Sequence, residues 1–227
     1  MGSPQVKVIA HIETPFKEKF GVPRQAGLVD YESRIVFEPE YRVAEAVRGL
    51  EEFDYLWLIW QFHLAEREKW SPTVRPPRLG GNRRVGVFAT RSPFRPNPIG
   101  LSSVRLLRIE PGPVLVVSGA DLVDGTPILD IKPYIPYADS HPDARSGFAS
   151  EAPAATLRVD DPQHLLDCLP AHQRRALAGA LSFDPRPHYQ NDPQRVYSLE
   201  YDCYEVRFNV VGDTVRLLSL MLNKVKS

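Results

Sequence analysis

The chain has 227 residues, and its 28 Lys and Arg balance 28 Asp and Glu, so the formal net charge is zero. A hydrophobic content of 43% and a charged content of 25% are typical of a globular protein with a substantial core. Two cysteines without a CxxC pair argue against a disulfide framework or a zinc site and favour a reducing compartment. The polar first residues are unlike a signal peptide, and the most apolar run, Tyr55–Leu64, is about half the length that a bilayer requires. We therefore expect a cytoplasmic protein without a membrane segment.

The first third of the chain predicts two strands and one helix. Alternating polar and apolar residues predict a strand over residues 6–12. A long irregular loop follows, and the spacing of apolar residues predicts a helix over residues 39–50. Tyr55–Leu64 is apolar on both faces, as expected of a central strand, and polarity enters only near its end, at Gln61 and His63.

Short strands dominate the middle of the chain. We expect strands over residues 85–90, 99–109 and 114–119. Asp124-Gly125 predicts a tight turn between residues 122–123 and a strand over 127–131. Several closely spaced short strands with one early helix favour a barrel or sandwich over a parallel α/β sheet.

The last third predicts a small α+β unit. The composition shifts to Ala, Ser, Pro and Asp over residues 137–156, which we interpret as a linker. Beyond it, proline-initiated helices are expected over 161–169 and 170–181. Alternating residues from 204 onwards predict a strand that returns after a turn at Gly212-Asp213.

The most informative segment is Gly86–Ser102, because three prolines stiffen the loop at its centre. Proline fixes its own φ and keeps the preceding residue extended. Such rigidity is unnecessary in an ordinary connection but is typical of binding sites. The side chains that this loop would hold at nearly fixed positions are Arg91, Phe94, Arg95 and Asn97.

The charge around this loop is strongly asymmetric. No acidic residue occurs between Glu68 and Glu110, whereas nine Lys and Arg residues do. A positive field of this kind attracts phosphates and steers polyanions. The alternative is a solvated face that happens to lack acids, but these arginines occur among Pro and Gly rather than along a helix, so we favour a binding surface.

Other motifs are weaker. The chain has no GxGxxG after a strand and no GxxxxGK[ST], GxSxG or HExxH, and its six histidines are not at metal-ligand spacing, so no metal is expected. His63 at the end of a buried strand is more often a core residue than a functional one. Asp130 and Lys132, two apart on one strand face, are either used or form a surface ion pair. The proline-stiffened segment 184–189 suits a nucleobase or phosphate as well as it suits packing.

Several ordered segments together resemble the TrmO (TsaA-like) tRNA methyltransferases. The resemblance spans nearly the whole chain and is most specific in the Gly86–Ser102 loop. The other matching segments are Glu18–Gln25, Phe53–Trp57 with Phe62-His63, Pro76–Asn82, Asp121–Pro127, Asp130–Tyr134 and Asp184–Tyr189.

The resemblance implies a mainly β architecture: a barrel-like methyltransferase domain, unrelated to the Rossmann type, over residues 1–140. A linker or crossing segment over 141–160 and a small α+β C-terminal domain over 161–227 that assists tRNA binding would follow. It also implies S-adenosylmethionine as the methyl donor and a homodimer. The implied substrate is threonylcarbamoyl-adenosine beside the anticodon of threonine tRNAs, methylated at its exocyclic N6.

The donor contacts follow from the resemblance by matching position, and the substrate contacts from the chemistry of the residues. The donor would contact Arg24, Gln25, Ala26, His63, Leu64, Arg91, Leu101, Asp124, Gly125, Thr126 and Pro127. We expect substrate contacts from Phe94, Arg95, Lys132, Arg84, Arg186 and Tyr189. Methyl transfer from a sulfonium is an in-line displacement, so catalysis should come mostly from positioning. A catalytic residue must accept the proton of the reacting nitrogen or orient it: Asn97 is the candidate, because it can accept a hydrogen bond from that N–H, and Tyr134 or Asp130 is the runner-up as proton acceptor.

Two other functions remain open at this point. One is a tRNA-binding protein without catalytic activity, which would bind tRNA but not S-adenosylmethionine. The other is a methyltransferase on the same scaffold whose acceptor is a small molecule.

Overall fold

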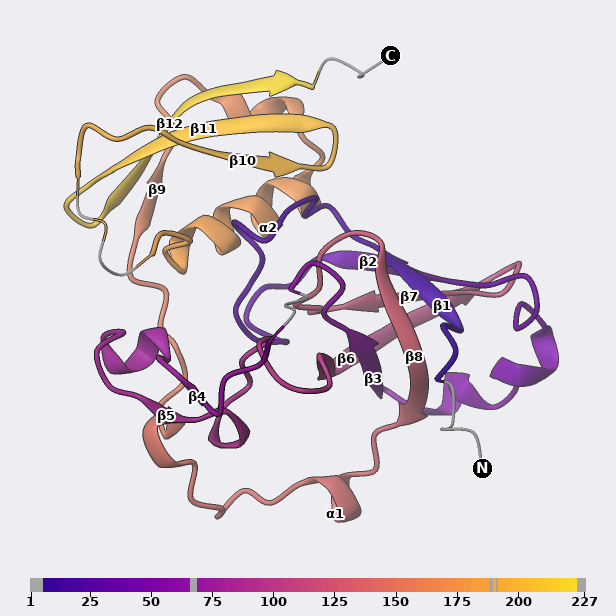
Figure 1. Ribbon diagram of the computed structural model, residues 1–227. Helices are drawn as coiled ribbons and strands as arrows, with labels where there is room; N and C mark the ends of the chain where they lie inside the picture. The colour runs from indigo at the N-terminus through magenta and orange to yellow at the C-terminus, as the bar shows by residue number, and fades with distance from the viewer. Residues whose placement is uncertain (1–5, 66–68, 188–189, 191, 224–227) are drawn as a thin grey trace. The chain divides into compact units, whose positions relative to one another are not determined.

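The computed structural model describes residues 6–65, 69–187, 190 and 192–223 (Figure 1). It contains two compact units that interleave along the chain. The first comprises the segments up to Glu13, Ser33–Ser118 and Gly125–Glu151, and the second comprises Thr14–Glu32, Gly119–Asp124 and the chain from Ala152 onwards. The sequence, in contrast, predicts three consecutive segments.

A closed six-stranded barrel, in the order β1-β2-β7-β6-β3-β8, forms the first unit. Its strands are β1 (Ala10–Glu13), β2 (Glu32–Phe37), β3 (Tyr55–Gln61), β6 (Ile99–Glu110), β7 (Val114–Ser118) and β8 (Thr126–Pro133). Closure comes from β1, which pairs antiparallel with both β2 and β8 and so leaves the sheet without an edge. The expectation of a mainly β, barrel-like fold is confirmed.

The predicted central strand is β3, which pairs with β6 on one side and β8 on the other. Alternate residues point to opposite faces of a strand, and Leu56, Leu58 and Trp60 are buried while Tyr55 is 45% exposed. The inward side chains form the core with Val104 and Ile128 and their neighbours. Both faces of β3 are apolar, because one face fills the barrel and the other carries half-buried side chains outside it.

Smaller elements of the first unit lie outside the barrel strands. A two-stranded sheet joins β4 (Thr73–Val74) to β5 (Val85–Gly86). The remaining elements are η1 (Ala44–Val47), η2 (Leu50–Glu52), η3 (Pro77–Leu79), η4 (Val87–Ala89), α1 (Pro136–Asp139) and η5 (Gly147–Ala149).

The second unit is a four-stranded sheet in the order β10-β11-β12-β9 with one long helix, α2 (Ala171–Ser182). The strands are β9 (Arg158–Asp160), β10 (Tyr197–Tyr201), β11 (Tyr204–Val211) and β12 (Thr214–Leu222), and η6 (Leu165–Cys168) precedes α2. Leu177 and Leu181 are fully buried on α2. The predicted helix after Pro170 and the predicted strand pair around Gly212-Asp213 are confirmed.

Two predicted helices are wrong. Residues 39–50 form only the short 3-10 helix η1 and the start of η2, because Arg48 is extended and Gly49 has a φ of 84°, which interrupts any continuous helix. Residues 161–169 form only η6. There the Asp161 carboxylate accepts the N–H groups of Leu165 and Leu166 at 2.8 and 2.9 Å, so Asp161 stabilises a single short turn.

Some predicted strand limits also differ. The first strand begins at Ala10 rather than at residue 6. The strand expected over 85–90 is limited to β5, because the chain turns into η4 immediately afterwards. The sequence analysis did not predict β2, β9 or β10.

Candidate functional site

The proline-rich loop folds onto itself through hydrogen bonds to its own backbone. Arg95 Nη1 donates to the carbonyl oxygens of Thr90 at 3.0 Å and Ser92 at 3.4 Å. Hydroxyl groups of the same two residues accept the N–H groups of Ser92 and Phe94, at 3.2 and 3.3 Å. The rigidity predicted from the prolines is thus reinforced by an arginine that bridges the start of the loop.

The far end of the loop is joined to the end of β3. Phe62 N–H donates to the Pro98 carbonyl at 2.7 Å, and Ile99 pairs with Gln61 in the sheet. Behind this junction Trp60 Nε1 donates to Ser102 Oγ at 3.0 Å, and the Trp60 and Phe62 rings are 4.2 Å apart. The half-buried His63 and the exposed Leu64 follow directly, so the structure brings them beside the loop.

The outer face of the barrel carries three more predicted residues. Ile59 lies opposite Leu101 on β6 and Asp130 on β8, and Trp57 lies opposite Lys132. Directly opposed residues share a face of the sheet, so these side chains form one surface. Leu101 is 52% exposed on it.

The Asp130–Lys132 pair forms the exposed ion pair that the sequence analysis gave as one alternative. Lys132 Nζ lies 2.7 Å from Asp130 Oδ2, with side-chain exposures of 60% and 45%. The other carboxylate oxygen of Asp130 accepts the N–H of Ile131 at 2.9 Å. An exposed pair of this kind contributes little to stability.

Tyr134 packs against two aromatic rings, one of which is held by Asp139, an acid that the sequence analysis missed. Its ring centroid lies 5.6 Å from that of Trp57 and 6.3 Å from that of Tyr55. Asp139 Oδ2 accepts both the Ile135 N–H at 2.8 Å and the Trp57 indole N–H at 2.9 Å. These two hydrogen bonds, the backbone one first, lower the pKa of Asp139, which favours its ionised form. No local motif links Asp139 to Trp57, because the contact spans 82 positions.

The Asp124-Gly125 turn is real, but it does not join two paired strands. Gly125 N–H donates to the Ile12 carbonyl at 2.8 Å, and the buried Thr126 pairs with the same residue where β8 begins. Pro127 lies opposite His11. The predicted turn therefore leads into β8, but residues 122–123 before it form no strand.

Asp124 itself is tied within the second unit. Its Oδ1 accepts the Thr14 N–H at 2.8 Å, and its Oδ2 lies 3.0 Å from Lys17 Nζ. Both carboxylate oxygens therefore have protein partners, which fixes the segment that precedes the turn.

In a second cluster of the same unit, Arg24 joins two of the segments that carry the family resemblance, Glu18–Gln25 and Asp184–Tyr189. Arg24 Nη2 donates to the carbonyl oxygens of Asp184 and Arg186, at 3.1 and 3.0 Å. The Arg186 guanidinium contacts both carboxylate oxygens of Asp184 at 2.8 Å, and Arg186 is only 8% exposed. Arg186 stays a prediction as a substrate contact, and this geometry favours a structural role in the 184–187 turn.

The remaining predicted residues divide between the two units. Gln25 and Ala26 are half-buried in the second unit, where Gln25 Nε2 donates to the Arg24 carbonyl at 2.6 Å. Arg91 is exposed in the first unit, and Arg84 there donates to Thr73 Oγ1 at 3.1 Å. Tyr189 lies outside the described residues.

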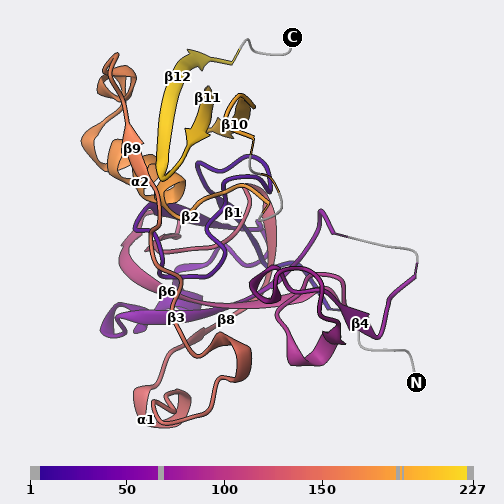
Figure 2. The same ribbon diagram turned by 90° about the vertical axis from the view of Figure 1, so that its left-hand side faces the viewer.

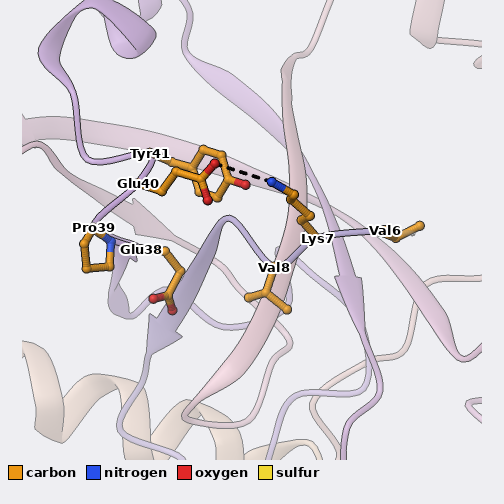
Figure 3. A pocket seen from close by; sticks show the side chains of 7 residues that line it. All are labelled: Val6, Lys7, Val8, Glu38, Pro39, Glu40 and Tyr41. Atoms are coloured by element: carbon orange, nitrogen blue, oxygen red, sulfur yellow. Dashed lines mark hydrogen bonds and ion pairs between the residues drawn. The ribbon is translucent and has the colours of Figure 1, made fainter. Parts of the chain in front are cut away.

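A recess of about 610 Å³ lies elsewhere on the first unit, between the segment before β1 and the segment after β2 (Figure 3). It is lined by Val6, Lys7, Val8, Glu38, Pro39, Glu40 and Tyr41. Lys7 Nζ lies 3.4 Å from Glu40 Oε1 and 6.0 Å from the centre of the Tyr41 ring. None of these residues was predicted as a site residue, and Lys7 and Glu40 form an ion pair with each other.

Within the described part of the chain, no group of three or more His, Cys, Asp or Glu side chains is placed to hold a metal ion. None of the helices found there is long and apolar enough to cross a bilayer.

Comparisons with known proteins find relatives of this chain over nearly its whole length. The family model for the tRNA-methyltransferase O N-terminal domain matches residues 11–140, and that for the TrmO C-terminal domain matches 155–222. The chain is 44% identical to the tRNA (adenine(37)-N6)-methyltransferase of Escherichia coli K12, over 97% of this chain and 99% of that protein. A relative in Pseudomonas aeruginosa with the words S-adenosylmethionine-dependent methyltransferase in its name is 42% identical, over 95% and 96%.

A solved structure gives the same result. A crystal structure of TrmO from Pseudomonas aeruginosa superposes with a TM-score of 0.80 at 34% identity, over 98% of this chain and 99% of that one. Fold and matches together define a methyltransferase built on a closed β-barrel. The chain belongs to the TrmO family.

Proposed function

We propose that this protein transfers a methyl group from S-adenosylmethionine to N6 of adenosine 37 in tRNA. The finer substrate that we propose is threonylcarbamoyl-adenosine beside the anticodon of threonine tRNAs. The observation that carries the proposal is the similarity, over almost the full length of both chains, to a relative with the adenine-37 activity in its name.

The residues at the end of β3 fit the donor. Half-buried His63 and the exposed apolar side chains of Leu64 and Leu101 suit an adenosine, and the exposed Arg91 suits a carboxylate. When bound, S-adenosylmethionine supplies a methyl group on a positively charged sulfur. We assign Gly125, Thr126 and Pro127 to the same role by their match to the family. Four other predicted donor contacts lie in the second unit and stay predictions: Arg24, Gln25, Ala26 and Asp124.

We assign orientation of the reacting N–H to Asn97, with the proton leaving to water, because the Asn97 backbone is fixed and its side chain is exposed. Pro96 and Pro98 flank it, and its carbonyl accepts the Ile99 N–H at 2.7 Å. The amide oxygen of Asn97 can therefore orient the N–H of the reacting nitrogen while Phe94 stacks on the base. Asp130 forms an ion pair with Lys132, and Tyr134 packs against its aromatic neighbours. We therefore rank both residues behind Asn97 for this role.

The proposed reaction can be tested on purified components. The protein, S-adenosylmethionine and threonine tRNA carrying threonylcarbamoyl-adenosine should give a nucleoside heavier by one methyl group in mass spectrometry. Calorimetry should show binding of S-adenosylmethionine. Binding of tRNA alone would favour the non-catalytic alternative, and an unchanged methylated fraction in tRNA from a strain lacking the gene would favour a small-molecule acceptor.

Replacing Asn97 by Ala should slow single-turnover methylation about 100-fold and leave the tRNA Kd within about twofold, because the hydrogen bond that orients the reacting nitrogen lowers the barrier rather than strengthening binding. Asn97→Asp is the matched control, since its carboxylate still accepts a hydrogen bond and should retain most of the rate. Normal methylation by Asn97→Ala would move the role to Tyr134 or Asp130.

The assembly and location that we propose are a homodimer in the cytoplasm. The exposed apolar side chains of Tyr55 (45%) on β3 and Ile99 (42%) on β6 support a protein partner for the barrel. Light scattering coupled to gel filtration measures the mass of the particle directly.

A further inference from the structure

Two large aromatic side chains lie exposed beside each other next to the short β4–β5 sheet, outside the barrel strands. We call residues 69–88, which contain this sheet, the β4–β5 arm. Trp70 is 54% exposed and Phe88 is 73% exposed, with ring centroids 6.4 Å apart and planes inclined by 31°. Exposing two large apolar ring faces to water costs free energy, which a ligand that covers the rings would recover.

The local backbone explains why the two rings meet. Trp70 precedes β4 and Phe88 follows β5, so the two residues lie at the same end of the antiparallel pair. Val87 N–H donates to the Pro72 carbonyl at 3.0 Å, which extends the pairing towards the rings. The arm lies to one side of the barrel in both Figure 1 and Figure 2. The aromatic pair is thus held on a defined support rather than on an unpaired loop.

The same arm is strongly basic. It contains no Asp or Glu, and its cationic side chains are all exposed: Lys69, Arg75, Arg78, Arg83 and Arg84. Ring faces with arginines around them are the combination that proteins use for single-stranded nucleic acid, where bases stack and phosphates meet the cations.

The surface chemistry favours RNA over a protein or a lipid bilayer. Among described residues 69–98, the large hydrophobic side chains that are exposed are Trp70 and Phe88, both of them aromatic. A hydrophobic protein interface or a membrane-inserting patch would add aliphatic residues such as Leu and Ile. Flat rings without them suit the face of a base.

We propose that Trp70 and Phe88 form a stacking platform for an unpaired base of the tRNA substrate, and that Arg83 and Arg84 bind the adjoining phosphates. This inference rests on the proposed tRNA substrate and names a second RNA contact. The base on the platform is distinct from the methylated base assigned to Phe94. Because stacking needs an exposed base face, the platform selects unpaired loops over duplex RNA.

Binding of a fluorescein-labelled anticodon stem-loop of threonine tRNA, measured by anisotropy, tests the platform. Phe88→Ala and Trp70→Ala should each weaken the Kd roughly 5- to 150-fold, as loss of one base stack does. Phe88→Tyr keeps the ring and should bind normally. Tyr137→Ala removes an aromatic that is 90% exposed on α1 of the same unit, outside the arm, and should leave the Kd unchanged.

Salt dependence separates the rings from the arginines. Arg83→Gln should lower the slope of log Kd against log salt by about 1, whereas Phe88→Ala should leave the slope unchanged. Each loop nucleotide of the RNA can be replaced in turn by an abasic one. At one position Phe88→Ala should weaken the Kd no further, because the base that stacks on the platform is already missing. Wild-type protein and Phe88→Ala should bind an RNA duplex of the same length equally well.

The outcomes distinguish the inference from the function on which it rests. Wild-type protein that binds no tRNA contradicts the proposed function. Wild-type binding with Phe88→Ala and Trp70→Ala both within about twofold contradicts the platform alone. Loss of binding to phosphatidylserine vesicles in Phe88→Ala, with RNA binding intact, would reassign the arm to membranes. Phe88 is 73% exposed, so its replacement should leave the fold intact, and circular dichroism checks this.

Discussion

Replacing Gly100 by Ala should lower the free energy of unfolding by about 3 kcal/mol, because the added methyl group overlaps a fixed ring. A Cβ at this position would lie 2.3 Å from Trp60 Cε2 and 2.4 Å from Cζ2. Trp60 is 6% exposed, and its indole N–H is held by Ser102. The ring cannot move aside without breaking that hydrogen bond, so the strand itself must shift.

The consequence should reach the donor site, because Gly100 directly follows the segment joined to Phe62. Gly100→Ala should therefore also weaken S-adenosylmethionine binding, which calorimetry measures. Urea unfolding gives the stability. Gly86→Ala is the matched control: its backbone φ is −58° and nothing lies within 4 Å of its added Cβ, so the change should stay within about 1 kcal/mol.

A double variant isolates the cause. Trp60→Leu removes the ring that the methyl group meets, so adding Gly100→Ala to it should cost much less than in the wild-type background. A coupling of about 1 kcal/mol or more is expected for residues in direct contact. Equal losses in both backgrounds would show that the overlap with Trp60 is not the reason.

Local patterns predicted the elements whose stability is itself local or strongly periodic. The apolar run of β3, the long β6 and the helix after Pro170 were all visible in the sequence. The helix over 39–50 failed because a periodic apolar pattern does not reveal that Gly49 takes a left-handed conformation. Closure of the barrel by β1 and β8 joins residues more than 110 positions apart, which no local window contains.

Local sequence likewise predicted only part of the candidate site. The prolines of the 93–98 segment predicted a stiff loop, but the bridge from Arg95 to the Thr90 carbonyl depends on the folded path of the chain. Residue type alone also gave Arg186 a substrate role, whereas its surroundings show a buried guanidinium against Asp184. Type and spacing indicate which chemistry a segment can do; burial and partners decide which side chains are available for it.

Replacing Arg186 by Ala should lower the free energy of unfolding by about 2–3 kcal/mol, since it leaves a partly buried carboxylate without its partner. The two side chains are 9% and 28% exposed. The matched control is Arg216→Ala, which removes an ion pair with Asp160 whose side chains are 59% and 38% exposed in the same unit. It should change stability by less than about 1 kcal/mol.

The pH dependence of this loss identifies the pair as its source. Burial opposes ionisation of Asp184, but the hydrogen bonds and charge of Arg186 outweigh it and lower the pKa of Asp184 below its ordinary 3.8. The unfolded chain therefore binds this proton more tightly, so the pair stabilises fully above about pH 4 and loses its effect as pH falls through the lower folded pKa. The wild-type and Arg186→Ala stabilities, measured by urea unfolding, should converge in acid. A gap that persists at low pH, or a tRNA Kd weakened while Arg186→Ala is fully folded, would instead support the substrate contact predicted from sequence.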